Sequence, residues 1–180
     1  MKNIYICLSL LIISIILTYS LGSFYAYFYP MKFCDEIKEY STEFGVEPAL
    51  VASVINVESG YREKAISSKG AQGLMQIMPS TGEWLAGKIG EKYEDNVLLE
   101  GKFNIKIGTY YLSYLINQFG DKKLALCAYN AGQRNVKEWL KNSEYSQDGK
   151  ILKKIPFLET ENYIKKVEKN YSYYKNRYAK

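Results

Sequence analysis

The sequence predicts a mainly α-helical single domain that follows an N-terminal membrane-spanning helix. The chain has 180 residues, which is room for one ordinary domain. Beyond Pro30, apolar residues recur at helical spacing, and no segment shows the alternation that marks a strand. Residues 4–28 contain no charged side chain and are almost wholly apolar or aromatic. We therefore expect a transmembrane segment over residues 1–30 and a folded domain over residues 31–180.

The composition favours a packed globular domain and excludes several kinds of active site. Hydrophobic residues make up 47% of the chain and charged residues 24%, which are ordinary values for a globular protein. The chain contains no histidine, so histidine bases, histidine-activated nucleophiles and most zinc sites are excluded. The net charge of +5 is spread along the chain, and we do not expect a nucleic-acid partner. Catalysis must therefore depend on carboxylates, lysine, tyrosine or cysteine.

Cysteine usage and sequence fingerprints give no sign of a cofactor. Cys7, Cys34 and Cys127 are too few and too scattered for a disulfide framework or a metal cluster. A pairing of Cys34 with Cys127 stays open. No nucleotide-binding fingerprint is present, so we expect neither a metal nor an organic cofactor.

The apolar N-terminal segment has two interpretations. As a helix, 25 residues extend over roughly 37 Å, enough to cross a hydrocarbon core of about 30 Å. The alternative is a cleaved secretory signal, with Lys2 before an apolar region and Ser20-Leu21-Gly22 as a weak cleavage site. We favour the anchor because the apolar run continues past that site. Both interpretations place the later residues outside the cytoplasm.

Five helices are predicted in the remaining chain. A stripe of apolar and aromatic residues ends at Gly45, and the next helix begins near Pro48, a residue favoured in the first turn. Two further stripes end at Gly120 and near Asn130. The last stripe consists mostly of tyrosines, and we interpret it as a packing face. The predicted helices cover residues 33–44, 48–58, 104–119, 123–129 and 160–178.

Glu58 is the carboxylate that the pattern singles out. Val51, Val54 and Ile55 form an apolar stripe, and Glu58 continues it on the same helix face. A carboxylate in that position loses water, which disfavours its charged form and raises its pKa. A general acid that works near neutral pH needs such a shift. The plain alternative is a helix-end glutamate that turns to solvent or pairs with Arg62 or Lys64.

A glycine-spaced segment, residues 67–79, follows this helix. Its polar side chains alternate with apolar ones, an arrangement that suits a backbone passing close to a ligand. Ser80 and Glu83 have the spacing of a capping box that opens another helix.

Four motifs in this order resemble the soluble type of the lytic transglycosylase family. They are Glu58-Ser59-Gly60-Tyr61, the stretch from Gly70 to Pro79, the stretch from Ala128 to Gly132, and Ile155 to Thr160 followed by Tyr163. The resemblance covers residues 44–171, essentially the whole predicted domain. It implies a lysozyme-like fold that cleaves the bond between N-acetylmuramic acid and N-acetylglucosamine in peptidoglycan.

The resemblance also implies roles for individual residues. Glu58 would be the sole catalytic carboxylate, first as an acid and then as a base toward the sugar's own C6 hydroxyl, which leaves a 1,6-anhydro end. In the sequence around it, Glu63 and Glu83 are the further acids, and we expect both to have polar, exposed settings. Ordinary glycosidases use two carboxylates. The substrate-binding positions that the resemblance implies are Ser68, Met75, Gln76, Tyr129, Asn130, Glu159 and Tyr163.

Two positions depart from the family pattern. Glu161 stands where the family commonly has arginine, and Gly82 stands where it often has alanine. The first reverses a charge beside the expected site, and the second should weaken the helix after Ser80 slightly.

Three functions remain open on the sequence. The first is a membrane-anchored lytic transglycosylase for wall remodelling or for opening space for an envelope-spanning machinery. The second is a muramidase, in which water replaces the C6 hydroxyl. The third is a non-catalytic module that binds peptidoglycan strands, although binding alone does not require an acid at Glu58.

Overall fold

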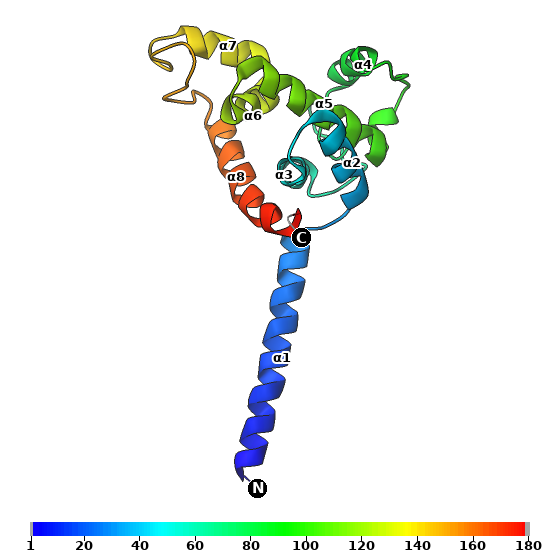
Figure 1. The fold of residues 1–180 in the computed structure, drawn as a ribbon, viewed down its shortest axis with the longest axis vertical. Coiled ribbons are helices and arrows are strands. Elements are labelled where there is room, and N and C mark those ends of the chain that lie inside the picture. Colours follow the sequence, from blue (N-terminus) through cyan, green and yellow to red (C-terminus); the bar gives the residue numbers. More distant parts are fainter. Residues whose placement is uncertain (1, 179–180) are drawn as a thin grey trace. The chain divides into compact units, whose positions relative to one another are not determined.

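The computed structural model describes residues 2–178 and divides into two compact units, residues 1–32 and residues 33–180 (Figure 1). The first unit consists mainly of α1, Lys2–Phe28. Within α1, Leu10–Phe28 has a mean hydropathy of 1.7 and is long and apolar enough to cross a membrane. The helix predicted for the N-terminal segment is therefore present.

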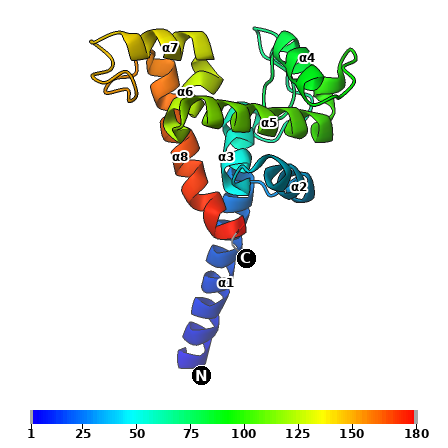
Figure 2. The ribbon, with the colours of Figure 1, turned by 45° about the horizontal axis from the view of Figure 1, so that its top comes forward.

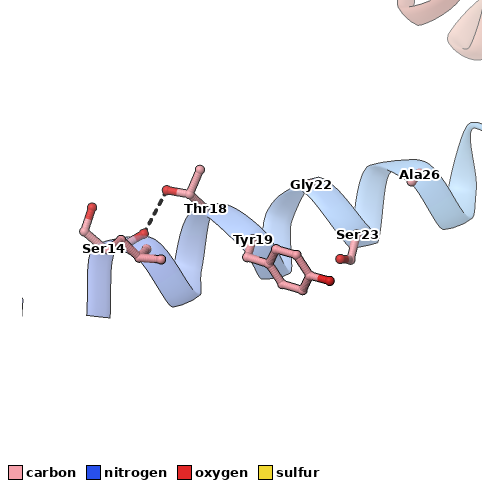
Figure 3. A pocket seen from close by; sticks show the side chains of 7 residues that line it. Ser14, Thr18, Tyr19, Gly22, Ser23 and Ala26 are labelled. Atoms are coloured by element: carbon pink, nitrogen blue, oxygen red, sulfur yellow. Dashed lines mark hydrogen bonds between the residues drawn. The ribbon is translucent and has the colours of Figure 1, made fainter. Parts of the chain in front are cut away.

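One side of α1 carries small side chains. Ser14, Thr18, Gly22 and Ala26 follow one another at four-residue spacing, and Figure 3 shows them along the helix. The Thr18 hydroxyl donates to the Ser14 carbonyl at 2.8 Å, so the polar group is satisfied within the helix. The small side chains leave a shallow groove of about 630 Å³ beside Tyr19.

The second unit is helical, as predicted. Its α-helices are α2 Cys34–Phe44, α3 Pro48–Ser59, α4 Pro79–Lys88, α5 Gly101–Phe119, α6 Lys122–Ala131, α7 Gln133–Lys141 and α8 Leu158–Tyr178, with a 3-10 helix, η1, at Val97–Leu99. Within residues 2–178 the extended pairings are isolated bridges, among them Ile66 with Gln72 and Gln72 with Ile77. The five helices predicted from apolar stripes correspond to α2, α3, α5, α6 and α8, and the further helix expected at Ser80 corresponds to α4, whereas α7 is not among the predicted elements.

Local sequence explains most helix boundaries. Pro48 occupies the first turn of α3, and Gly45 ends α2 in a left-handed conformation. The Asp121 side chain accepts a hydrogen bond from the Leu124 N–H at 2.7 Å and caps α6. The predicted capping box is wrong, because α4 begins at Pro79 with Met78 rather than Ser80 as its N-cap, and no side-chain bond caps it. The thioether of Met78 is a weak acceptor for the free N–H groups of the first turn.

The core surrounds α3, which packs along α8 (Figure 2). Val51, Val54 and Ile55 of α3 are fully buried. The predicted packing face of α8 is confirmed at Tyr163, Ile164, Val167 and Tyr174, all of which are buried. Helix α3 therefore packs mainly against α8 and to a smaller extent against α2.

The two described cysteines of the second unit, Cys34 and Cys127, are both free thiols. Cys127 is fully buried in α6, which is consistent with a small core residue. Burial raises the pKa of the Cys127 thiol to about 11. The sequence left a Cys34–Cys127 disulfide open, and in the structure the two thiols are not bonded to each other.

Candidate active site

Glu58 lies in the last turn of α3 and is partly buried. Burial raises the pKa of its carboxyl to about 7. The negative charge of Glu159 adds to this rise, and the nearby Tyr163 phenol opposes it. The desolvated carboxylate that the apolar stripe of α3 predicts is therefore present.

Two tyrosines lie near this carboxyl, Tyr163 buried and Tyr129 partly buried. Tyr163 comes from α8 and Tyr129 from α6, and burial raises the pKa of both phenols well above its usual value. The charge of Glu58 raises both pKa values further, so the two rings lie close to it. Both phenols therefore stay protonated at neutral pH, and of the two only the Tyr163 hydroxyl lacks a hydrogen-bond partner among the described residues.

The Tyr129 hydroxyl donates to the Met75 carbonyl at 2.7 Å. It thus fixes the loop between α3 and α4. The Tyr163 hydroxyl, in contrast, is buried without a hydrogen-bond partner among the described residues, and its phenol lowers the pKa of the nearby Glu58 carboxyl. The hydroxyl of Tyr129, a predicted substrate-binding residue, is therefore used by the loop backbone.

Asn104 is a functional position that the sequence analysis missed. It is fully buried in α5, and its Oδ1 accepts from the Met75 N–H at 2.7 Å. Its Nδ2 donates to the carbonyls of Gln72 and Leu98 at 2.9 and 2.8 Å. A signal existed, because Asn104 is a polar residue on the same face of its helix as Gly108 and Tyr111. Its partners lie up to 32 residues away in sequence, and no local pattern indicates them.

Gly73 has a packing role in this loop. Its φ is 78°, and a Cβ at this position would overlap the Asn104 side chain and the Leu98 carbonyl. The glycine therefore permits the loop backbone to approach α5. The ligand approach that the sequence suggested is not needed to explain this residue.

Three predicted substrate-binding positions lie in or next to this loop. Met75 is fully buried and packs against Gly108, where a Cβ would overlap the methionine side chain. Gln76 is partly buried, and its Nε2 donates to the carbonyls of Gly73 and Ala65 at 2.9 and 3.2 Å. Ser68 is exposed in the preceding turn. Met75 therefore faces the core, while Gln76 is oriented by the backbone around it.

The remaining predicted positions belong to α6 and α8. The Thr160 hydroxyl donates to Asn130 Oδ1 at 2.8 Å, which links the end of α6 to the start of α8. Glu159 is exposed in the first turn of α8. The structure thus brings Tyr129, Tyr163 and Glu159 to the neighbourhood of Glu58, and Asn130 next to the helix that carries two of them.

The acids near Glu58 differ from the expectation. Glu63 is partly buried, and its Oε1 accepts from the Gly101 N–H at 2.7 Å at the start of α5. A carboxylate at a helix N-terminus is stabilised by the free N–H groups and the helix dipole. Glu83 is exposed, as expected. The carboxylate that acts on Glu58 is instead Glu159, which comes from the last motif.

Comparison with known proteins identifies the fold of the second unit. Residues 35–152 match the family model of the transglycosylase SLT domain. The soluble lytic murein transglycosylase of Salmonella typhimurium is 36% identical over 152 residues, which cover 82% of this chain and 24% of that protein.

Solved structures give the same result. The lytic transglycosylase Slt from Pseudomonas aeruginosa, solved as an inactive mutant, superposes with a TM-score of 0.75 and 29% identity, over 84% of this chain and 25% of that one. A 70-kDa soluble lytic transglycosylase in complex with bulgecin A superposes with a TM-score of 0.75 and 32% identity, over the same shares. The chain therefore spans about a quarter of the length of these relatives.

Proposed function

The chain belongs to the transglycosylase SLT domain family, and from this premise we propose that it is a peptidoglycan lytic transglycosylase with Glu58 as its catalytic acid and base. The bond cleaved would be the β-1,4 bond between N-acetylmuramic acid and N-acetylglucosamine. The observation that carries this proposal is the carboxyl of Glu58, whose pKa burial raises to about 7. Such a group holds its proton at neutral pH and can still release it, as general acid and base catalysis requires.

The reaction would take place in two proton transfers. Glu58 donates its proton to the glycosidic oxygen as the bond from that oxygen to C1 of the muramic acid breaks. The C6 hydroxyl of the same sugar then bonds to C1, and its proton returns to the Glu58 carboxylate. The acid is regenerated without water, and the product carries a 1,6-anhydro ring. No second carboxylate is needed, because the nucleophile belongs to the substrate.

Tyr163 would position the acid, because its buried hydroxyl has no other partner among the described residues and its phenol favours the carboxylate form of Glu58. Gln76, Asn130 and Glu159 would contact the sugars from the loop and from α6 and α8. Met75 would support the site from the core side, since its side chain is fully buried. Ser68 would act from an exposed turn.

A muramidase is the second candidate, and Glu159 is the observation that favours it. Glu159 lies close enough for its charge to raise the pKa of Glu58. A second carboxylate near the acid is what an inverting or retaining glycosidase uses to activate water or to attack the sugar. In that case the product would carry a reducing end in place of the anhydro ring.

We further propose that α1 anchors the chain in the membrane with the second unit outside the cytoplasm. The support is the long apolar stretch of α1 and the location of peptidoglycan outside the membrane. Wall cleavage from this position would serve remodelling or would open space for an envelope-spanning machinery.

The test is mass analysis of the products that the full chain, in detergent micelles, releases from purified peptidoglycan. The parent chain is compared with Glu58→Gln and with Glu63→Gln, a control that alters a carboxylate at the start of α5. We expect anhydro-ended products from the parent and the control, and none from Glu58→Gln.

Each other result selects a different function. Reducing ends that disappear with Glu58→Gln would replace the transglycosylase by the muramidase. Products that persist in Glu58→Gln would remove Glu58 from the chemistry. A folded parent chain that binds peptidoglycan and releases nothing would make the domain a binding module.

A further inference from the structure

Trp84 and Tyr114 form an open aromatic pair where α4 lies beside α5 (Figure 2). Their ring centroids are 5.2 Å apart and the ring planes meet at 87°. Trp84 keeps 37% of its surface exposed, although the next two residues of α4, Leu85 and Ala86, are fully buried. Helix α4 is thus held firmly against the core while the largest side chain in it stays accessible.

Further rings connect this pair with the acid. Tyr111 lies one turn before Tyr114 on α5, and residues three apart share a helix face. The ring centroid of Tyr111 is 5.2 Å from that of Tyr129, which the charge of Glu58 reaches. The rings of Trp84, Tyr114, Tyr111 and Tyr129 therefore form a series that begins on α4, crosses α5 and ends beside Glu58.

We propose that Trp84 and Tyr114 form an accessory subsite for the glycan strand, away from the bond that Glu58 cleaves. This inference rests on the proposed function, because the strand is the substrate of that function. A pyranose ring has apolar C–H faces and polar edges, which suits amphipathic aromatic side chains. The indole N–H and the phenol hydroxyl can in addition form hydrogen bonds with the acetamido and hydroxyl groups of the sugar.

Another aromatic pair on the same helix differs in this respect. Tyr110 packs against Phe44 of α2 with 5.3 Å between ring centroids, on the side of α5 that faces the core helices. This pair does not belong to the series that leads to Glu58. It therefore provides a control for the disruption of an aromatic pair that includes a ring of α5.

The subsite would favour long strands. A strand that extends from Glu58 to Trp84 gains the ring contacts, whereas a short fragment that spans only the scissile bond cannot reach them. Trp84 would thus act on substrate binding and leave the chemical step unchanged. A substitution at Trp84 should change the KM for long strands and spare the kcat.

The experiment uses the full chain in detergent micelles with two substrates, purified long glycan strands and the shortest soluble fragment that contains the scissile bond. The variants are Trp84→Ala, Trp84→Phe and the control Tyr110→Ala. We expect Trp84→Ala to raise the KM for long strands about tenfold and to leave both constants for the short fragment unchanged. Trp84→Phe should restore most of the loss, and Tyr110→Ala should change the two substrates equally.

Other outcomes would overturn the subsite. An equal change on both substrates in Trp84→Ala would indicate a structural role, and no change on either would leave Trp84 a surface ring only. A parent chain that cleaves neither substrate would be a failure of the proposed function alone. Binding then tests the subsite, because Trp139 is only 7% exposed and Trp84 reports contact with added strands through its fluorescence. Emission that does not respond to the strands would refute the proposal.

Discussion

At the scale of residues, Glu58 links the activity of the chain to pH. Its carboxyl must be protonated to act as an acid, and its pKa is raised to about 7. We therefore expect the rate of glycan cleavage to fall as the pH rises through about 7. Glu159→Gln should move this fall to lower pH, because it removes a negative charge that raises the pKa of Glu58.

The control for this prediction is Glu161→Gln. Glu161 stands in the same turn of α8 and pairs with Lys165 at 2.6 Å, so its loss should leave the pH profile in place. The measurement is the pH dependence of kcat/KM for the parent and both variants. Equal profiles for the parent and Glu159→Gln would contradict the electrostatic role of Glu159.

The same carboxyl makes the stability of the domain depend on pH. Its pKa is 4.5 in an ordinary setting and about 7 in the folded chain, so the folded state holds a proton that the unfolded state releases. This contribution is complete below about pH 4.5 and is lost as the pH rises through about 7. Glu58→Gln should therefore be more stable than the parent at about pH 8, by up to a few kcal/mol, and nearly equal to it at about pH 4.5. Urea unfolding at both pH values measures the difference, and a constant difference would exclude linkage through Glu58.

Asn104 should carry a large share of the order in the loop between α3 and α4. Asn104→Leu has nearly the same volume but leaves the Met75 N–H and two carbonyls without their buried partner. We expect a loss of about 3 kcal/mol in the free energy of unfolding. Asn135→Leu is the matched control, since that exposed side chain of α7 only bonds the Ala131 carbonyl at the end of α6. Denaturant unfolding of both variants checks the contrast, and similar losses would refute the role of Asn104.

At the scale of elements, close helix packing depends on small residues. Gly108 lets α5 approach Met75, and a Cβ there would overlap the methionine side chain. Gly108→Ala should therefore lower the free energy of unfolding by about 1 to 3 kcal/mol. Gly87→Ala in the exposed part of α4 meets nothing within 4 Å and should raise it by up to about 1 kcal/mol. Thermal unfolding compares the two, and a Gly108→Ala chain as stable as the parent would show that the loop can shift.

Gly82 illustrates how a departure from the family pattern can have a packing reason. From sequence, a glycine in place of alanine appears only to weaken the helix. In the structure a Cβ at this position would lie 2.9 Å from the Leu98 side chain and 3.2 Å from the Tyr93 ring. The glycine thus allows α4 to lie close to the segment around η1.

Helical periodicity and stop signals are local, so the sequence was sufficient for α2, α3, α5, α6 and α8. Glu58 was found for the same reason, since it continues a stripe on its own helix. Asn104, Glu63 and the contact of Tyr163 with Glu58 depend on segments far apart in the chain, and nothing within one helix indicates them. The capping box failed because a proline took the first position of α4. Helix α7 was not predicted because it contains few apolar residues, of which only Val136 and Trp139 are buried.

At the scale of the whole molecule, the N-terminal segment determines where the domain acts. If α1 remains attached, the chain sediments with membranes and resists extraction by alkaline carbonate. Intact mass spectrometry of the extracted chain should then include residues 1–30, because the apolar stretch continues past the weak cleavage site to Phe28. A soluble product that begins after Gly22 would show that the segment is a cleaved signal.

The backbone of Met75 is held at two points. Asn104 accepts a hydrogen bond from its N–H, and Tyr129 donates one to its carbonyl. Loop amides usually exchange their protons with solvent quickly, because small local openings expose them. The Met75 amide is tied to α5 and the adjoining carbonyl to α6, so no small opening frees it. In heavy water we expect this proton to be among the last in the domain to be replaced by deuterium, at a rate set by global unfolding. The loop segment around Met75 would then be as resistant to local unfolding as the helices of the core.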